Sequence, residues 1–200
     1  MKRCKYLIIL FLLIIVTGCS DSSKYEVLLE GSSNSYYNWS YEIEDDSIIK
    51  IVDESYYGKE ADDEIVGLEG EYKFVFEALK AGETTIKFKY MRTWEQEDVL
   101  YEYVISLNVN DKLKISKKNE SGNYLSLEKI LTYDLDKLGL DKNFSEYKLI
   151  FDNNIVSIEG KECDFLTVYD YQDMIINVYG IARNENIVYK MVDGKMQIIE

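Results

Sequence analysis

The sequence of 200 residues contains no histidine and no proline. Without an imidazole, neither a Ser-His-Asp nor a Cys-His catalytic arrangement can form within this chain, and zinc sites that depend on histidine are excluded as well. Only catalysis by carboxylates remains possible. Pairs of acidic residues are so frequent in this sequence that no one pair can be singled out as a catalytic site. We therefore expect a protein that is not an enzyme and that needs neither a metal nor another cofactor.

No apolar run reaches the roughly 20 residues of a membrane-spanning helix. The most apolar segment, 6–16, follows Lys2, Arg3 and Lys5, a pattern typical of a signal peptide, which we predict over 1–18. The segment closes on V-T-G-C, 16–19, which resembles a bacterial lipobox. This resemblance implies that Cys19 is diacylated and anchors the exported protein to the outer face of the cell membrane. The alternative is an ordinary signal peptide cleaved nearby or an uncleaved anchor.

Cysteine is rare, and removal of the signal peptide leaves only Cys19 and Cys163. If Cys19 carries lipid, Cys163 has no partner, so we expect no disulfide framework. Cys163 lies in an apparent strand with Lys161 as its one basic neighbour. We therefore expect a small buried apolar side chain rather than a reactive thiol.

Positive charge is also scarce. The net charge is −14, and loss of the three basic residues of the signal peptide takes it to −17. Nucleic acid and anionic lipid headgroups are therefore excluded as main partners, since binding phosphate requires a basic face. The acidic surface is expected to keep an exported protein soluble.

Alternating apolar and polar residues predict strands over much of the chain. After a polar tether at 19–24, a first domain is expected over 25–110. Its short strands, separated by turn residues and without a helical period, predict a β-sandwich. The expected strands are 25–29, 39–43, 47–52, 72–78, 84–90 and 99–109.

A polar stretch at 111–123 is interpreted as a linker to a second domain at 124–200. Apolar residues from Leu127 to Leu138 recur at helical spacing, with Ser126 as the expected N-cap and Gly139 just past the C-terminus. Strands are expected at 147–151, 163–169, 174–182, 187–192 and 196–199. This domain is predicted to be a small α+β unit, with one helix on an antiparallel sheet.

Three connections of the first domain carry unusual residues. They read G-S-S-N-S-Y-Y-N-W at 31–39, G-L-E-G-E-Y-K-F at 67–74 and R-T-W-E at 92–95, the last preceded by A-G at 81–82 and an amphipathic strand. In order and spacing they resemble the three loops of the chagasin family, inhibitors of papain-like cysteine proteases. The resemblance covers about residues 24–110.

The resemblance implies an immunoglobulin-like β-sandwich whose three loops enter the active-site cleft of a papain-like cysteine protease. It also implies which residues contact the protease. They are Gly31, Ser35, Tyr37, Gly67, Gly70, Arg92 and Trp94. Trp39 and Phe74 also match the family pattern, but we expect both in the core of the sandwich.

The sequence departs from the family in each connection. Residues 32–36 replace an N-P-T-T-G core and so lose its proline and glycine, Glu69 replaces a glycine, and Thr93 replaces a proline. Alternatives also stay open for the contact residues. Gly67 and Gly70 could serve only to allow positive φ in a hairpin, Tyr36 and Tyr37 could be half-buried turn residues, and Arg92 with Trp94 could be a cation-π pair that closes a hairpin.

Two functions are consistent with these patterns. The first is a cell-surface lipoprotein that inhibits papain-like cysteine proteases, favoured by the intact register through Arg92 and Trp94. The alternative is a non-inhibitory immunoglobulin-like adhesion or assembly module, favoured by the altered first connection. The sequence of the second domain predicts no activity.

Overall fold

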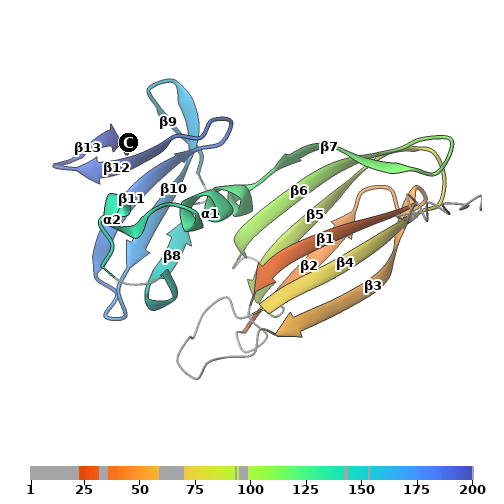
Figure 1. The fold of residues 1–200 in the computed structure, drawn as a ribbon, viewed down its shortest axis with the longest axis horizontal. Helices are drawn as coiled ribbons and strands as arrows, with labels where there is room; N and C mark the ends of the chain where they lie inside the picture. Colours follow the sequence, from red (N-terminus) through yellow and green to blue (C-terminus); the bar gives the residue numbers. More distant parts are fainter. Residues whose placement is uncertain are drawn as a thin grey trace, which may run out of the picture.

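The computed structural model describes residues 23–31, 36–58, 70–92, 94, 99–141, 144–152 and 154–199. Two β-rich domains follow one another along the chain (Figure 1). None of the helices in these ranges has the length and hydropathy of a membrane-spanning segment.

The first domain is a sandwich of two antiparallel sheets, as predicted. One sheet has the strand order β1-β4-β3 and the other β2-β5-β6-β7. The strands are β1 (Lys24–Gly31), β2 (Tyr37–Ile43), β3 (Ile49–Gly58), β4 (Gly70–Ala78), β5 (Gly82–Arg92), β6 (Val99–Val109) and β7 (Ile115–Ser121).

The core of the sandwich forms because alternate residues of each strand face the opposite sheet. In β6 every second residue from Tyr101 to Val109 is buried, as the alternation predicts. Trp39 and Phe74 are also buried, which confirms their expected place in the core.

The expected linker at 111–123 is not what the structure shows. Residues 115–121 form β7, which pairs antiparallel with β6 from Ile115↔Val109 to Ser121↔Val104. This edge strand has the burial pattern Beeeeie, so its sequence lacks the alternation that identifies a strand with a buried face. The sandwich therefore extends to Ser121, and Gly122 alone separates β7 from the first helix.

The second domain places two short helices on one face of an antiparallel sheet (Figure 1). The sheet order is β13-β12-β11-β10-β8, with β9 paired to β10. The elements are α1 (Asn123–Leu131), α2 (Leu135–Leu138), the 3-10 helix η1 (Phe144–Glu146), β8 (Lys148–Phe151), β9 (Val156–Ile158), β10 (Lys161–Tyr169), β11 (Ile175–Ala182), β12 (Val188–Val192) and β13 (Lys195–Ile198).

The helical segment differs from the predicted single helix. It is interrupted after Leu131, and Asp134 starts α2 by accepting a hydrogen bond from the Asp136 backbone N–H. Ser126 is not an N-cap, because it lies inside α1 and its hydroxyl donates to Asp164 at 2.7 Å. Gly139 does end the helical segment, with the left-handed φ of 70° that glycine favours.

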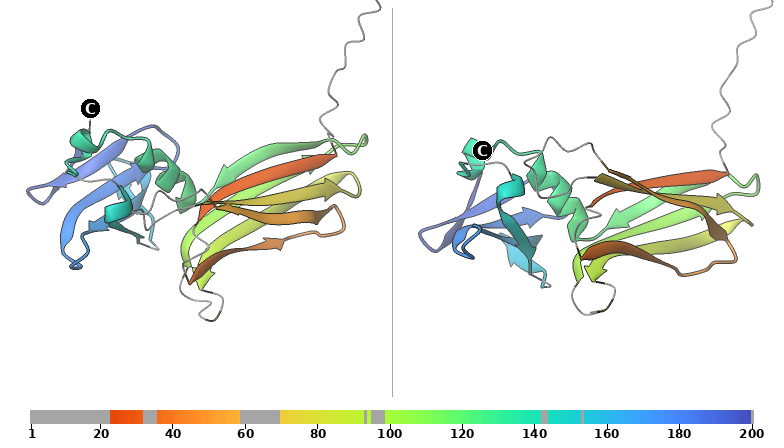
Figure 2. Two further views of the ribbon diagram at one scale, coloured as in Figure 1. Left: turned by 60° about the horizontal axis from the view of Figure 1, so that its bottom comes forward. Right: turned by 90° about the horizontal axis from the view of Figure 1, so that it is seen from below.

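The two domains share one hydrophobic core. Buried side chains of α1, including Tyr124 and Leu127, belong to the same cluster as Trp39 and Tyr103 of the sandwich. The ring of Phe151 in β8 also meets Tyr101 of β6 edge-on, with centroids 6.2 Å apart. The second domain is therefore packed on the end of the sandwich, as the views of Figure 2 show.

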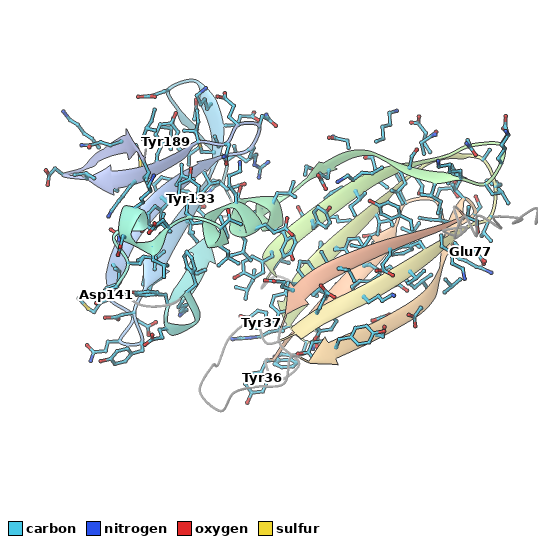
Figure 3. The ribbon with its side chains drawn as sticks, in the orientation of Figure 1. Tyr36, Tyr37, Glu77, Tyr133, Asp141 and Tyr189 are labelled. Atoms are coloured by element: carbon cyan, nitrogen blue, oxygen red, sulfur yellow. The ribbon has the colours of Figure 1, made fainter. Side chains whose placement is uncertain are left out.

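The sandwich has two distinct ends. Lys24, at the start of β1, pairs with Glu77, and the strand runs to the pair Gly31↔Gly70. Figure 3 shows Glu77 at the end far from the second domain, and Tyr36 and Tyr37 at the near end. The chain thus enters the sandwich at the end opposite the second domain.

Candidate functional site

The three connections start and finish at the near end of the sandwich. Gly31 ends β1 beside Gly70, which starts β4, and Tyr37 starts β2 beside Arg92, which ends β5. A hydrogen bond joins the two sheets at this end: the Tyr72 hydroxyl of β4 donates to Asn38 Oδ1 of β2 at 3.0 Å. The ends of β1, β2, β4 and β5, which are distant in sequence, therefore lie at the same end of the sandwich.

Not all of the predicted contact residues can be placed. Ser35 and Gly67 lie outside the described residues, as does the predicted lipidation site Cys19. Gly31, Tyr37, Gly70 and Arg92 lie together at this end.

Two large aromatic side chains are exposed at this end. Tyr36 is 73% exposed and Trp94 is 62% exposed. Their rings meet edge to face, with centroids 5.8 Å apart and an interplanar angle of 77°. An edge-to-face pair fixes the relative orientation of two rings, so the first and third connections present one joint apolar surface.

Side chains of β2 and β5 form a stack at the same end of the sandwich. The Arg92 guanidinium carbon lies 5.0 Å from the centre of the Tyr37 ring, and Tyr37 stacks on Tyr90 with centroids 5.8 Å apart. Tyr90 in turn contacts the buried Trp39, with centroids 5.2 Å apart. Arg92 therefore makes its cation-π contact with Tyr37, rather than with Trp94 as the alternative interpretation had it.

Neighbouring tyrosine rings occupy the space where two glycines at this end would carry a side chain. A Cβ on Gly70 would lie 2.2 Å from the Tyr56 hydroxyl, and one on Gly31 would lie 2.9 Å from Tyr72 Cε2. Both glycines allow tyrosine rings to pack flat on the sheet.

The hydroxyl of Tyr72, whose ring packs on Gly31, is neutral at physiological pH. Burial, together with nearby Tyr90, Tyr56 and Glu54, raises the pKa of Tyr72 to about 12. Its hydroxyl therefore remains a hydrogen-bond donor at neutral pH. Tyr56 and Tyr72 were not predicted as part of the site, although a tyrosine two residues from a glycine on each strand was visible in the sequence.

The described residues hold no group of three or more histidine, cysteine, aspartate or glutamate side chains that could bind a metal ion. Cys163 is fully buried in the second domain, and burial raises the pKa of its thiol. The expectation that Cys163 is a buried side chain is thus confirmed. What the near end offers is a contact surface of aromatic rings, a guanidinium and close-packed backbone.

Comparison with known proteins agrees with the resemblance read from the three connections. Residues 20–109 match the model of the family described as Chagasin family peptidase inhibitor I42, which confirms the family prediction for the first domain. A crystal structure of the cysteine protease inhibitor EhICP2 from Entamoeba histolytica is also similar, with a TM-score of 0.40 and 22% identity over 44% of this chain and 78% of that chain. A search of curated proteins gave no match.

Proposed function

We propose that this chain, whose first domain matches the chagasin family, inhibits papain-like cysteine proteases by filling the active-site cleft with the near end of its sandwich. The single observation that carries the proposal beyond the family match is the joint surface of Tyr36 and Trp94, at the same end of the sandwich as the cation-π pair of Arg92 and Tyr37. Tryptophan, tyrosine and arginine are the residues most often found at binding hot spots.

Blocking a cleft needs no catalytic residue in the inhibitor, which suits a chain without histidine. The strand ends are fixed by two paired sheets, so little ordering entropy is lost on docking. A contact of about 1,600 Å², the usual size for a protease and its inhibitor, can then be tight. Ser35 and the backbone around it would lie over the catalytic thiolate, Gly67 would allow close approach of the second loop to the protease backbone, and Arg92 and Trp94 would contact the cleft wall. The tyrosine rings packed on Gly31 and Gly70 leave these two glycines a structural role at the base of the loops.

The proposal includes an anchor on the outer face of the cell membrane through diacylated Cys19. Its support is the signal-like segment with V-T-G-C and the position of β1. Because β1 starts at the far end of the sandwich, an anchor before it would leave the near end directed away from the bilayer.

A second candidate is a surface module that kept the fold but serves adhesion or assembly. It is favoured by one observation, the replacement of the N-P-T-T-G core by residues 32–36. In family inhibitors this loop enters the catalytic centre, so its altered composition bears directly on inhibition.

The test is a titration of a lipid-free form, residues 20–200, against papain and a cathepsin. The whole chain is used because β7 and the second domain complete the core of the sandwich. We expect slowing of substrate hydrolysis with a defined inhibition constant. No slowing of either enzyme at micromolar protein would overturn the proposed inhibition and leave the second candidate.

A further inference from the structure

The second domain contacts the backbone at the end of the third connection. Asn123, the first residue of α1, accepts a hydrogen bond from the Glu102 N–H at 2.7 Å and donates one to the Leu100 carbonyl at 3.3 Å. Both partners lie within the first four residues of β6, which starts at Val99 directly after the third connection. One amide side chain thus fixes the backbone where this connection ends.

The next residue of α1 contacts the start of the first connection. The Tyr124 hydroxyl accepts a hydrogen bond from the Glu30 N–H at 3.0 Å, one residue before Gly31. The Glu30 carbonyl in turn accepts from Trp39 Nε1 at 2.8 Å. β1 is an edge strand of its sheet, and the Tyr124 hydroxyl accepts from one of its backbone N–H groups.

The same tyrosine is connected to Tyr37 and Arg92 at the near end through packed rings. Tyr124 meets Trp39 edge-on, with centroids 5.2 Å apart and an angle of 90°. Trp39 packs on Tyr90, and Tyr90 packs on Tyr37. The Tyr37 ring in turn makes the cation-π contact with Arg92. Tyr124, Trp39 and Tyr90 are all buried, so a displacement of the first ring would be passed to the others.

Gly122 allows this approach. Its φ is 117°, and a Cβ there would lie 2.1 Å from the Glu102 carbonyl oxygen. Only glycine therefore brings α1 close enough for Asn123 to reach the backbone of β6.

We propose that Asn123 and Tyr124 are positioning residues of the protease-contact surface, through which the second domain fixes the ends of the first and third connections. The inference rests on the proposed function and gives the second domain a role in it. The first connection lacks the proline and glycine of the family pattern, and the third lacks its proline. Hydrogen bonds from α1 at the strand ends supply rigidity that these residues would otherwise give.

The test compares two double variants of the lipid-free chain. The first, Asn123→Ala with Tyr124→Phe, removes the bonds to Glu30, Leu100 and Glu102 and keeps the ring. The matched control, Asn177→Ala with Tyr179→Phe, removes an amide and a buried hydroxyl that bind the backbone of Leu138 and Gly139 inside the second domain. Both variants lose the same chemical groups.

The first readout is amide hydrogen exchange in the free protein, which needs no protease. We expect the Glu30 and Glu102 amides to exchange about tenfold faster or more in the first variant, because each loses its acceptor. The control should leave both amides unchanged. Equal exchange in the first variant and the wild type would overturn the proposal.

The second readout is the inhibition constant against papain. We expect it to rise about tenfold or more in the first variant, the size of one or two lost hydrogen bonds, and less than about twofold in the control. Faster exchange with an unchanged inhibition constant would also overturn the proposal. A wild-type chain that inhibits no protease would instead overturn the proposed function, and hydrogen exchange would still decide whether α1 fixes the strand ends.

Discussion

At the scale of single residues, Trp94 stands out because a large indole is left exposed beside an exposed tyrosine. Large apolar side chains that gather on a surface mark sites of interaction, whereas scattered ones are ordinary. Tyr36 and Trp94 touch although they belong to different connections. They are therefore the side chains whose removal should affect binding without affecting the core.

Trp94→Ala should weaken protease inhibition by about 2 kcal/mol or more, roughly 30-fold in the inhibition constant, as loss of a hot-spot residue does. The measurement is a titration against papain. Tyr171→Ala is the control, because Tyr171 is also a large exposed aromatic residue, on the β10–β11 hairpin of the second domain. An inhibition constant unchanged by Trp94→Ala would show that the near end of the sandwich is not the contact surface.

Glu120 links pH to the stability of the sandwich. Its partial burial opposes ionisation, but hydrogen bonds from Lys117 and Tyr103, at 2.7 and 2.6 Å, outweigh burial and lower its pKa. A carboxyl whose pKa is lower in the folded state stabilises the fold above its unfolded pKa. That contribution is lost as the pH falls through the folded pKa.

Glu120→Gln should therefore lower the free energy of unfolding by about 1 kcal/mol at pH 7, a figure reduced for partial exposure. The difference from wild type should shrink as the pH falls below the usual glutamate range. Urea unfolding of wild type and variant at pH 7 and at pH 3 measures the loss of stability and its decrease at low pH. Glu83→Gln, which removes the partner of Lys118 in an exposed ion pair, should have almost no effect at either pH.

The sequence was informative about some of these residues and not about others. Arg92 and Trp94 could be assigned to one connection because an alternating strand ends there. The contact of Trp94 with Tyr36 could not be predicted, because it depends on the paths of two connections that are distant in sequence. Asn123 was missed because it lies in a polar stretch interpreted as a linker, and a single amide in such a stretch carries no periodic signal.

At the scale of elements, the joint between β7 and α1 is the feature that most affects the fold. Gly122 alone separates the last strand of the sandwich from the first helix of the second domain. Its backbone approaches Glu102 too closely for any side chain. The geometry of the joint is thus fixed by one residue.

Gly122→Ala should lower the free energy of unfolding by about 3 kcal/mol or more, since the usual cost of about 1–2 kcal/mol for positive φ adds to an overlap with backbone. Gly194→Ala is the matched control. Gly194 also has positive φ, of 76°, but no atom lies within 4 Å of the added Cβ. Its cost should be about 1 kcal/mol. Equal losses in the two variants, measured by urea unfolding, would contradict the close approach.

Elements were predicted well where their pattern was long. The limits of β6 agree with the alternation over 99–109, because each inward residue faces the opposite sheet. β7 was missed because an edge strand with mostly exposed residues shows no alternation. The break between α1 and α2 was also missed, since the apolar spacing continues through it while Asp134 starts a new helix.

At the scale of the whole molecule, the continuous core joins two domains that the sequence suggested were separate. Buried residues of the sandwich, of α1 and of β8, β10, β11 and β12 form one cluster, and a smaller second cluster lies within the second domain. Domains joined by a large apolar interface are expected to unfold together rather than independently.

We therefore expect a single cooperative transition in urea, with the same midpoint for tryptophan fluorescence and for far-ultraviolet circular dichroism. Both tryptophans, Trp39 and Trp94, lie in the first domain, so fluorescence follows the sandwich, while circular dichroism also follows the helices of the second domain. Two separate midpoints would show that the shared core does not couple the domains.

The direction of β1 has a consequence for where an enzyme could be intercepted. The strand has 8 residues and, at about 3.3 Å per residue, spans about 26 Å from the far end of the sandwich to Gly31. If the chain is attached through Cys19 and β1 points away from the membrane, the exposed indole would lie about that height above the lipid headgroups. A protease whose cleft opens close to the bilayer would stay out of reach, whereas one diffusing past the cell could be captured.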